Sequence, residues 1–120
     1  MDIRTISGFL AELELNNNRA WFEEHRDTFK TRIEKPFREF IQTLLDQITK
    51  IEKSGPLRAE DAVFRIYRDI RFSKDKSPYK TYLSAIISPD GRTGMQLPGV
   101  YVELRADVVY VYAGIYQTDA

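Results

Sequence analysis

The chain has 120 residues, with 18 basic and 18 acidic side chains, and so carries no formal net charge at neutral pH. This length predicts a single domain, residues 1–120, that is large enough to bury a core, and the absence of cysteine excludes thiol catalysis and thiolate metal sites. A neutral chain is not expected to coat nucleic acid through its overall field, so any anion binding should be local.

Chemistry that needs a metal or a membrane has little support in the sequence. His25 is the one histidine, so a zinc site is disfavoured, and we expect no cofactor and no metal. No apolar run reaches the length of a signal peptide or of a membrane-spanning helix. We therefore expect a cytoplasmic protein without membrane association.

The first predicted element is a short amphipathic helix over residues 6–15, with Thr5 placed to cap it. Apolar side chains follow the i, i+3, i+4 and i+7 spacing of a helix face at Ile6, Phe9, Leu10 and Leu13. Asn16-Asn17-Asn18 should end this helix. Asparagine tolerates the left-handed conformation of a helix stop and also accepts hydrogen bonds from the first amides of a helix, so we expect the triplet to serve as C-cap and N-cap.

A second helix is predicted to begin near Arg19. Its apolar face consists of Trp21, His25, Phe29, Ile33, Phe37, Ile41, Leu44, Ile48 and Ile51. Pro36 lies within this run and cannot donate to the carbonyl four residues back, so we expect a kink or two abutting helices in nearly the same register. Phe40 is assigned to the core together with Phe29 and Phe37. Ser54-Gly55-Pro56 should end the run.

Beyond residue 80 the pattern changes to the alternation of β-strands. Segments rich in β-branched and aromatic residues, separated by turn residues at 88–91 and 106–107, cover 82–87, 100–104 and 108–115. They predict an antiparallel meander. Residues 62–72 fit a helix or a strand, and we favour a strand to about Tyr67 followed by an irregular loop. The order of elements predicts an α+β fold, with N-terminal helices packed on the antiparallel β-meander.

Residues 65–80, called here the basic loop, are the strongest candidate for a binding site. They contain six basic and two acidic side chains, a net charge of +4, whereas the rest of the chain is at −4. Arginine presents a fork of donors to phosphate or carboxylate, and lysine adds a mobile point charge. The candidate ligand-binding residues are Arg65, Arg68, Asp69, Arg71, Lys74, Asp75, Lys76, Tyr79 and Lys80.

Within this set, Asp69 and Asp75 would orient the cations, and Tyr79 would contribute a ring or a hydroxyl group. If Tyr67 and Tyr79 point outward, their rings would also suit the stacking of bases. Asn17, Asn18 and Trp21 could line the same pocket at a helix N-terminus, although helix capping alone accounts for asparagines at that position. His25 is expected at the margin of the core, with a general-base role as the alternative.

The polar positions of the basic loop also carry a resemblance. The pattern Arg65-x-x-Arg68-Asp69-x-Arg71-Phe72-x-x-Asp75-Lys76-x-x-Tyr79-Lys80, preceded by Asn17-Asn18-Arg19-x-Trp21-Phe22, resembles the signature of a widespread, mostly bacterial family classed as a domain of unknown function. The resemblance spans residues 7–116 and implies a shared fold, with no established activity, cofactor or catalytic residue. Members are usually longer, so the chain is expected to be the N-terminal part of a longer protein.

Three functional hypotheses remain open, and the catalytic residues, if any, are unknown. The first is binding of a phosphorylated ligand or of a nucleic-acid backbone by the basic loop. The second is a metal-dependent phosphoester hydrolase in which Asp69 or Asp75 holds the metal or acts as base. The third is a structural module whose charged loop makes ion pairs with the Glu-rich second helix or with a partner.

Motifs that would name a reaction are lacking. The sequence has no Walker-type phosphate loop, no dinucleotide fingerprint and no Gly-x-Ser-x-Gly elbow. Glu103-Leu104-Arg105 is only weakly similar to the acid-x-lysine element of some nucleases, because arginine stands at its third position. Strand edges left open by a missing C-terminal half would favour a homodimer.

Overall fold

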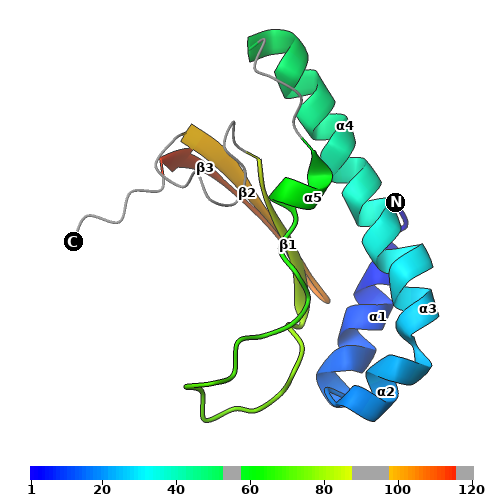
Figure 1. The fold of residues 1–120 in the computed structure, drawn as a ribbon. Coiled ribbons are helices and arrows are strands. Elements are labelled where there is room, and N and C mark those ends of the chain that lie inside the picture. Colours follow the sequence, from blue (N-terminus) through cyan, green and yellow to red (C-terminus); the bar gives the residue numbers. More distant parts are fainter. Residues whose placement is uncertain (53–57, 88–97, 116–120) are drawn as a thin grey trace.

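A computed structural model describes residues 1–52, 58–87 and 98–115 of the chain. The helices precede the strands along the chain, and they lie along one face of a three-stranded sheet (Figure 1). This arrangement confirms the predicted α+β class, with N-terminal helices packed on an antiparallel meander.

Helix α1 (Ile3–Leu15) begins earlier than predicted, because its N-cap is Asp2 and not Thr5. The Asp2 carboxylate accepts hydrogen bonds from the backbone N–H groups of Arg4 at 3.0 Å and Thr5 at 3.3 Å. Thr5 donates its hydroxyl to the other carboxylate oxygen of Asp2 at 2.9 Å. The ionised acceptor of aspartate therefore takes the capping position. The four predicted apolar residues of α1 are all buried.

The asparagines of the triplet have different structural roles. Asn16 is the C-cap of α1, with φ −136° and ψ 47°, so the left-handed conformation expected there is wrong. Asn18 is the N-cap of α2 (Arg19–Glu24) and accepts a hydrogen bond from the Trp21 N–H at 2.8 Å. The predicted pair of caps is thus confirmed.

The long apolar run after Arg19 folds as abutting segments rather than as one helix. After α2 come α3 (Arg26–Thr28), a π-helical turn η1 (Phe29–Glu34) and α4 (Lys35–Glu52). In η1 the Lys35 N–H reaches the carbonyl of Lys30, five residues back. The wider turn immediately precedes Pro36, whose ring would otherwise clash with the carbonyl four residues before it. The expected abutting helices are confirmed, with the irregularity just ahead of the proline.

Most of the predicted stripe is buried against α1 and the sheet. Phe29, Ile33, Phe37 and Ile41 are at most 4% exposed, and Phe22 and Leu45, which the stripe did not include, are at 1%. Phe40 was expected in the core and is 37% exposed, so that assignment is wrong. It lines an apolar groove of about 460 Å³ between α4 and the sheet. The expected helix stop at residues 54–56 lies outside the described residues.

The sheet consists of β1 (Tyr82–Ile87), β2 (Pro98–Arg105) and β3 (Val109–Ile115) in the order β1-β2-β3. Both pairings are antiparallel, with Leu83 opposite Leu104 and Val102 opposite Val111, so the predicted meander is confirmed. Successive side chains of a strand point to opposite faces. These four residues therefore belong to the face that the helices cover. The predicted turn at residues 88–91 lies outside the described residues.

The chain between α5 (Ala59–Ala62) and β1 is irregular. The strand predicted up to Tyr67 is wrong, because this stretch makes only two isolated bridges, Val63 to Ala85 and Tyr67 to Tyr79. Val63 and Ile66 are both buried although they lie three residues apart, which does not match the alternation of a strand covered on one face. The irregular basic loop that was predicted to follow is confirmed.

Candidate functional site: the basic loop and the adjoining sheet face

The basic loop projects away from the sheet and returns to it where β1 begins (Figure 1). Two backbone hydrogen bonds pin its ends together, from the Arg68 N–H to the Pro78 carbonyl at 2.9 Å and from the Lys80 N–H to the Ile66 carbonyl at 2.7 Å. The loop therefore has a closed neck, and its shape depends on the side chains within it.

Arg68 organises the interior of the loop. Its guanidinium donates to the carbonyl of Ser77 at 2.8 Å, to the carbonyl of Asp75 at 3.4 Å and to the Ser73 hydroxyl at 3.4 Å. An ion pair to the Asp75 carboxylate measures 3.3 Å, and the Arg68 side chain is 27% exposed. Most of the donors of Arg68 are thus directed at the loop itself.

The two carboxylates of the loop are also engaged locally. Asp75 accepts hydrogen bonds from the Ser77 N–H at 2.9 Å and from the Ser77 hydroxyl at 2.6 Å, and these bonds, together with Arg68, lower the pKa of Asp75. Asp69 pairs with the Arg71 guanidinium at 2.9 Å, which lowers the pKa of Asp69. Each carboxylate therefore pairs with one arginine of the loop.

Hydrogen bonds and ring contacts attach the loop to the helices. The Asn17 side-chain amide donates to the Tyr79 carbonyl at 2.8 Å and accepts from the Tyr79 N–H at 3.1 Å. The Tyr79 ring is stacked on Phe22, with ring centroids 4.1 Å apart. Among residues 1–52, 58–87 and 98–115 no ion pair joins the loop to the second helix, so the ion pairs expected with its glutamates are wrong.

The aromatic side chains of the loop are exposed to different degrees. Tyr79 is 2% exposed, and burial raises its pKa, so its ring offers no stacking surface to a ligand. Tyr67 is 49% exposed. Phe72 is 94% exposed at the corner of a turn closed by the Ser73 N–H and the Ile70 carbonyl at 3.3 Å, with the Arg71 guanidinium 5.7 Å from the ring centroid. The sequence had not distinguished these three rings.

Of the remaining cations, Arg65 and Lys80 flank the neck of the loop, whereas Lys74 and Lys76 lie in the loop beyond it. Lys80 Nζ lies 5.5 Å from the centroid of the Phe64 ring, and burial, followed by the charge of Arg65, lowers the pKa of Lys80. Within the described part of the chain, Arg65, Lys74 and Lys80 make no ion pair. Lys76 Nζ donates to the Ile70 carbonyl at 2.7 Å.

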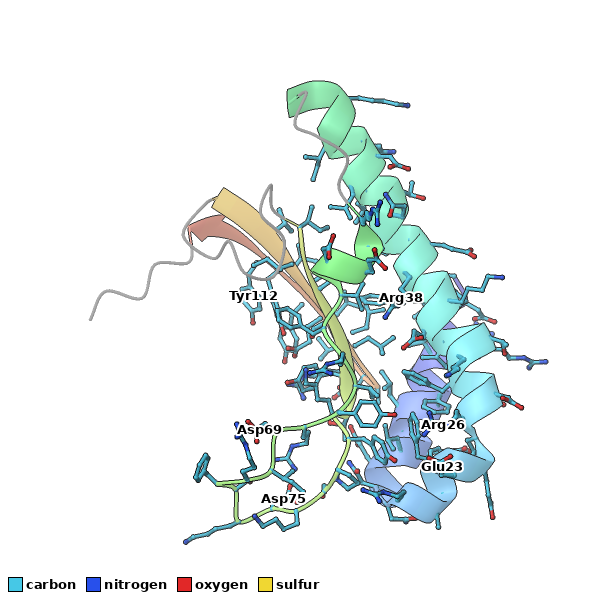
Figure 2. All side chains as sticks on the ribbon, in the orientation of Figure 1. Glu23, Arg26, Arg38, Asp69, Asp75 and Tyr112 are labelled. Atoms are coloured by element: carbon cyan, nitrogen blue, oxygen red, sulfur yellow. The ribbon has the colours of Figure 1, made fainter. Side chains whose placement is uncertain are left out.

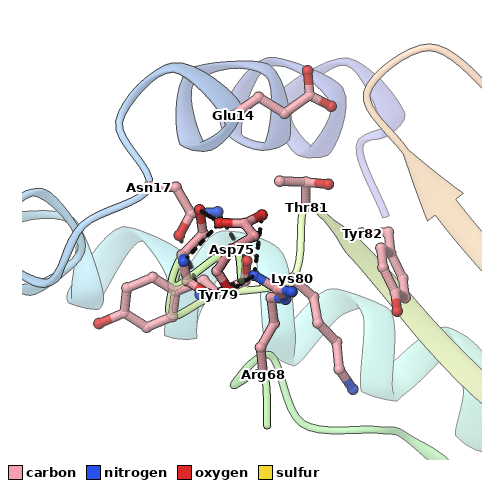
Figure 3. A pocket seen from close by; sticks show the side chains of 9 residues that line it. Glu14, Asn17, Arg68, Asp75, Tyr79, Lys80, Thr81 and Tyr82 are labelled. Carbon is pink, nitrogen blue, oxygen red and sulfur yellow. Dashed lines mark hydrogen bonds and ion pairs between the residues drawn. The ribbon is translucent and has the colours of Figure 1, made fainter. Parts of the chain in front are cut away.

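A polar pocket of about 270 Å³ opens beside the neck (Figure 3). Its lining comes from α1, the basic loop and the start of β1, and consists of Glu14, Asn17, Arg68, Asp75, Ser77, Tyr79, Lys80, Thr81 and Tyr82. Of the three residues near the start of α2 that were proposed for this pocket, Asn17 lines it, whereas Asn18 caps α2 and Trp21 does not line it. Three consecutive asparagines where two suffice as caps were the available signal for Asn17.

His25 lies at the core margin, as expected. Its Nδ1 is 2.8 Å from the Trp21 carbonyl, and its ring is stacked on Trp21 with centroids 4.1 Å apart. In the described part of the chain, no group of three or more histidine, aspartate or glutamate side chains is arranged to hold a metal ion.

The sheet face that points away from the helices carries residues that the sequence did not single out. The Glu103 carboxylate, with 12% of the side chain exposed, accepts hydrogen bonds from the Tyr101 hydroxyl at 2.6 Å and from Arg105 Nε. Burial and this carboxylate raise the pKa of Tyr101. Arg105 also covers the Tyr82 ring, 4.6 Å from its centroid. Glu103 and Arg105 pair with each other, and alternation along β2 places them with Tyr101 on one face.

Comparison with known proteins adds a family and no activity. Within the described ranges, none of the helices has the length and apolar character required to cross a membrane. No curated protein and no solved structure matches the chain. The family described as "Conserved hypothetical protein (DUF2461)" matches residues 5–120, which confirms the resemblance to a family of unknown function. The chain therefore belongs to this family of conserved hypothetical proteins.

Proposed function

We propose that the neck of the basic loop binds a phosphate-bearing ligand, with Arg65 and Lys80 as the principal contacts and Lys74 as a further cation on the loop. The supporting observation is the state of Lys80, a half-buried cation beside Arg65 whose pKa is lowered by burial and by that like charge. No carboxylate among the described residues forms an ion pair with either side chain. An anion placed between them would relieve the repulsion and compensate for the lost hydration.

The other candidate residues support this site indirectly. Arg68 and Asp75 fix the course of the loop, and Asp69 holds Arg71, so the frame of the site is assembled before any ligand arrives. A preassembled frame lowers the ordering cost of binding. Phosphoester hydrolysis would need Asp69 or Asp75 to hold a metal or act as a base, but each of these carboxylates already accepts several hydrogen bonds. For this reason we favour binding over hydrolysis. The cytoplasmic location and the homodimer stay predictions.

The proposal predicts that phosphate compounds stabilise the protein against heat and that Lys80→Met removes most of this response. Methionine keeps the apolar stem over Phe64 and deletes only the charge. Because a hydrogen bond to a charged group contributes about 1.5–3 kcal/mol, affinity should fall at least tenfold. Thermal unfolding with inorganic phosphate, nucleotides and short oligonucleotides would measure this, and the response should weaken as salt is raised.

Lys30→Met is the matched control, because Lys30 is an exposed lysine on η1. It should leave the response unchanged, and Lys80→Arg should restore part of it. If both methionine variants lost the response to phosphate compounds equally, the effect would come from the net charge of the protein and not from a site at Lys80. The absence of stabilisation of the wild-type protein by any of these anions would refute the proposal.

A further inference from the structure

A row of aromatic rings crosses the sheet face that points away from the helices. Tyr101 of β2 pairs with Tyr112 of β3, and Glu103 pairs with Tyr110. Ring centroids lie 6.5 Å apart between Phe64 and Tyr101, 6.2 Å between Tyr101 and Tyr112, and 5.9 Å between Tyr112 and Tyr110. Figure 2 shows Tyr112 on the side of the sheet opposite α4. Consecutive contacts thus join four rings from the edge of β1 to β3.

The row begins at the cations of the proposed phosphate site. Phe64, its first ring, is the ring that Lys80 Nζ approaches to 5.5 Å. Arg65 follows Phe64 in the chain, and on β2 the guanidinium of Arg105 lies over the Tyr82 ring. The one acidic group in the row, Glu103, is bonded to Arg105 and Tyr101. The face therefore offers rings and cations side by side, and its carboxylate is already compensated.

The far end of the row is open to solvent. Tyr110 is 37% exposed and Tyr112 is 52% exposed. Water-exposed aromatic rings on an open sheet are the surface on which unpaired bases stack, and each stacked base strengthens binding by about 5- to 150-fold. A duplex hides the faces of its bases, and a chain without net charge gives no general attraction for one.

We infer that this face is a stacking platform for single-stranded nucleic acid, in which phosphates lie at Lys80 and Arg65 and bases lie on Tyr112 and Tyr110. The inference rests on the proposed phosphate site, because the same cations hold the strand. It names the ligand class of that site as a polymer that carries phosphates and flat bases together.

Fluorescence anisotropy with two labelled strands of equal length tests the platform separately from the phosphate site. One strand is oligothymidylate, and the other is an abasic strand with the same number of phosphates. The wild-type protein should bind oligothymidylate at least fivefold more tightly than the abasic strand. Tyr112→Ala and Tyr110→Ala should bring this ratio toward one without changing the affinity for the abasic strand, whereas Tyr112→Phe, which keeps the ring, should preserve it.

The possible failures differ from one another. Equal affinity of the wild-type protein for both strands, with Lys80→Met weakening both, would overturn the platform and leave the phosphate site standing. If neither strand nor inorganic phosphate binds, both the platform and the phosphate site are wrong. Equal damage by Tyr112→Phe and Tyr112→Ala would assign the effect to the hydroxyl group and would overturn stacking.

Discussion

Replacement of Phe22 by alanine is expected to lower the free energy of unfolding by about 3–5 kcal/mol. Phe22 is 1% exposed, and its ring lies 4.1 Å from that of Tyr79 and 5.2 Å from that of Phe29, measured between centroids. The cavity would open where α2, η1 and the returning end of the basic loop meet. Three elements would therefore lose packing contacts at once, and the surrounding structure could not easily close the cavity.

Denaturant titration and thermal unfolding measure this effect, and the melting temperature should fall by roughly 10–20 °C. Phe72→Ala removes the same atoms from a side chain that is 94% exposed, so its expected change is within about 0.5 kcal/mol. A comparable loss of stability in both variants would contradict the assignment of Phe22 to the core and of Phe72 to solvent.

Arg68→Ala is expected to lower the free energy of unfolding by about 2 kcal/mol. A charged donor that loses its bonds costs about 1.5–3 kcal/mol, and partial exposure keeps the figure below that of a fully buried pair. The substitution leaves the carbonyls of Asp75 and Ser77 without their donor. The loop should then lose its fixed course, and phosphate affinity should fall as a secondary effect.

Two variants separate this structural role from direct contact with a ligand. Arg71→Ala removes an ion pair whose side chains are 76% and 63% exposed, so its expected cost is below about 1 kcal/mol. Arg68→Lys cannot reproduce the fork of donors and should restore little stability. If Arg68→Ala unfolds like the wild type and yet loses phosphate binding, Arg68 contacts the ligand and does not hold the loop.

Local patterns were sufficient to predict the layers of the fold. The spacing of Ile6, Phe9, Leu10 and Leu13 defines a helix face directly, and β-branched alternation defines the strands. The ends of the helices were harder to predict, because neighbouring residues compete for the capping position. Asp2, for example, caps α1 in place of Thr5. Val63 and Ile66 could not be assigned, because both contact a core that distant segments create.

The candidate site was chosen from charge density, but its geometry could not be derived from the sequence. Six cations in the basic loop are visible in the sequence, whereas the division into framework and exposed cations depends on hydrogen bonds such as those of Arg68 to the backbone. The bond between Asn17 and Tyr79 joins residues 62 positions apart. The aromatic row depends on the register that places Tyr101 opposite Tyr112. Neither contact has a local sequence signal.

The π-helical turn η1 explains why the buried apolar residues around it recur every four positions. Phe29, Ile33, Phe37 and Ile41 recur every four residues and are all buried, although an ordinary α-helix would rotate the last about 120° away from the first. The extra residue in η1 absorbs this drift. If one residue of η1 were removed, Phe29 and Ile41 would be eleven positions apart, which is about three turns of a regular α-helix. The four side chains would then share one face of such a helix.

The turn should therefore tolerate a deletion that the neighbouring helix does not. A chain that lacks Arg32 and carries Pro36→Ala, which removes the ring clash, is expected to fold with one continuous helix and an unchanged core. A chain that lacks Glu39 instead would turn everything beyond it by about 100° and should not fold cooperatively. Circular dichroism during heating distinguishes the two. Insertions and deletions in related chains should accordingly concentrate in η1 and spare α4.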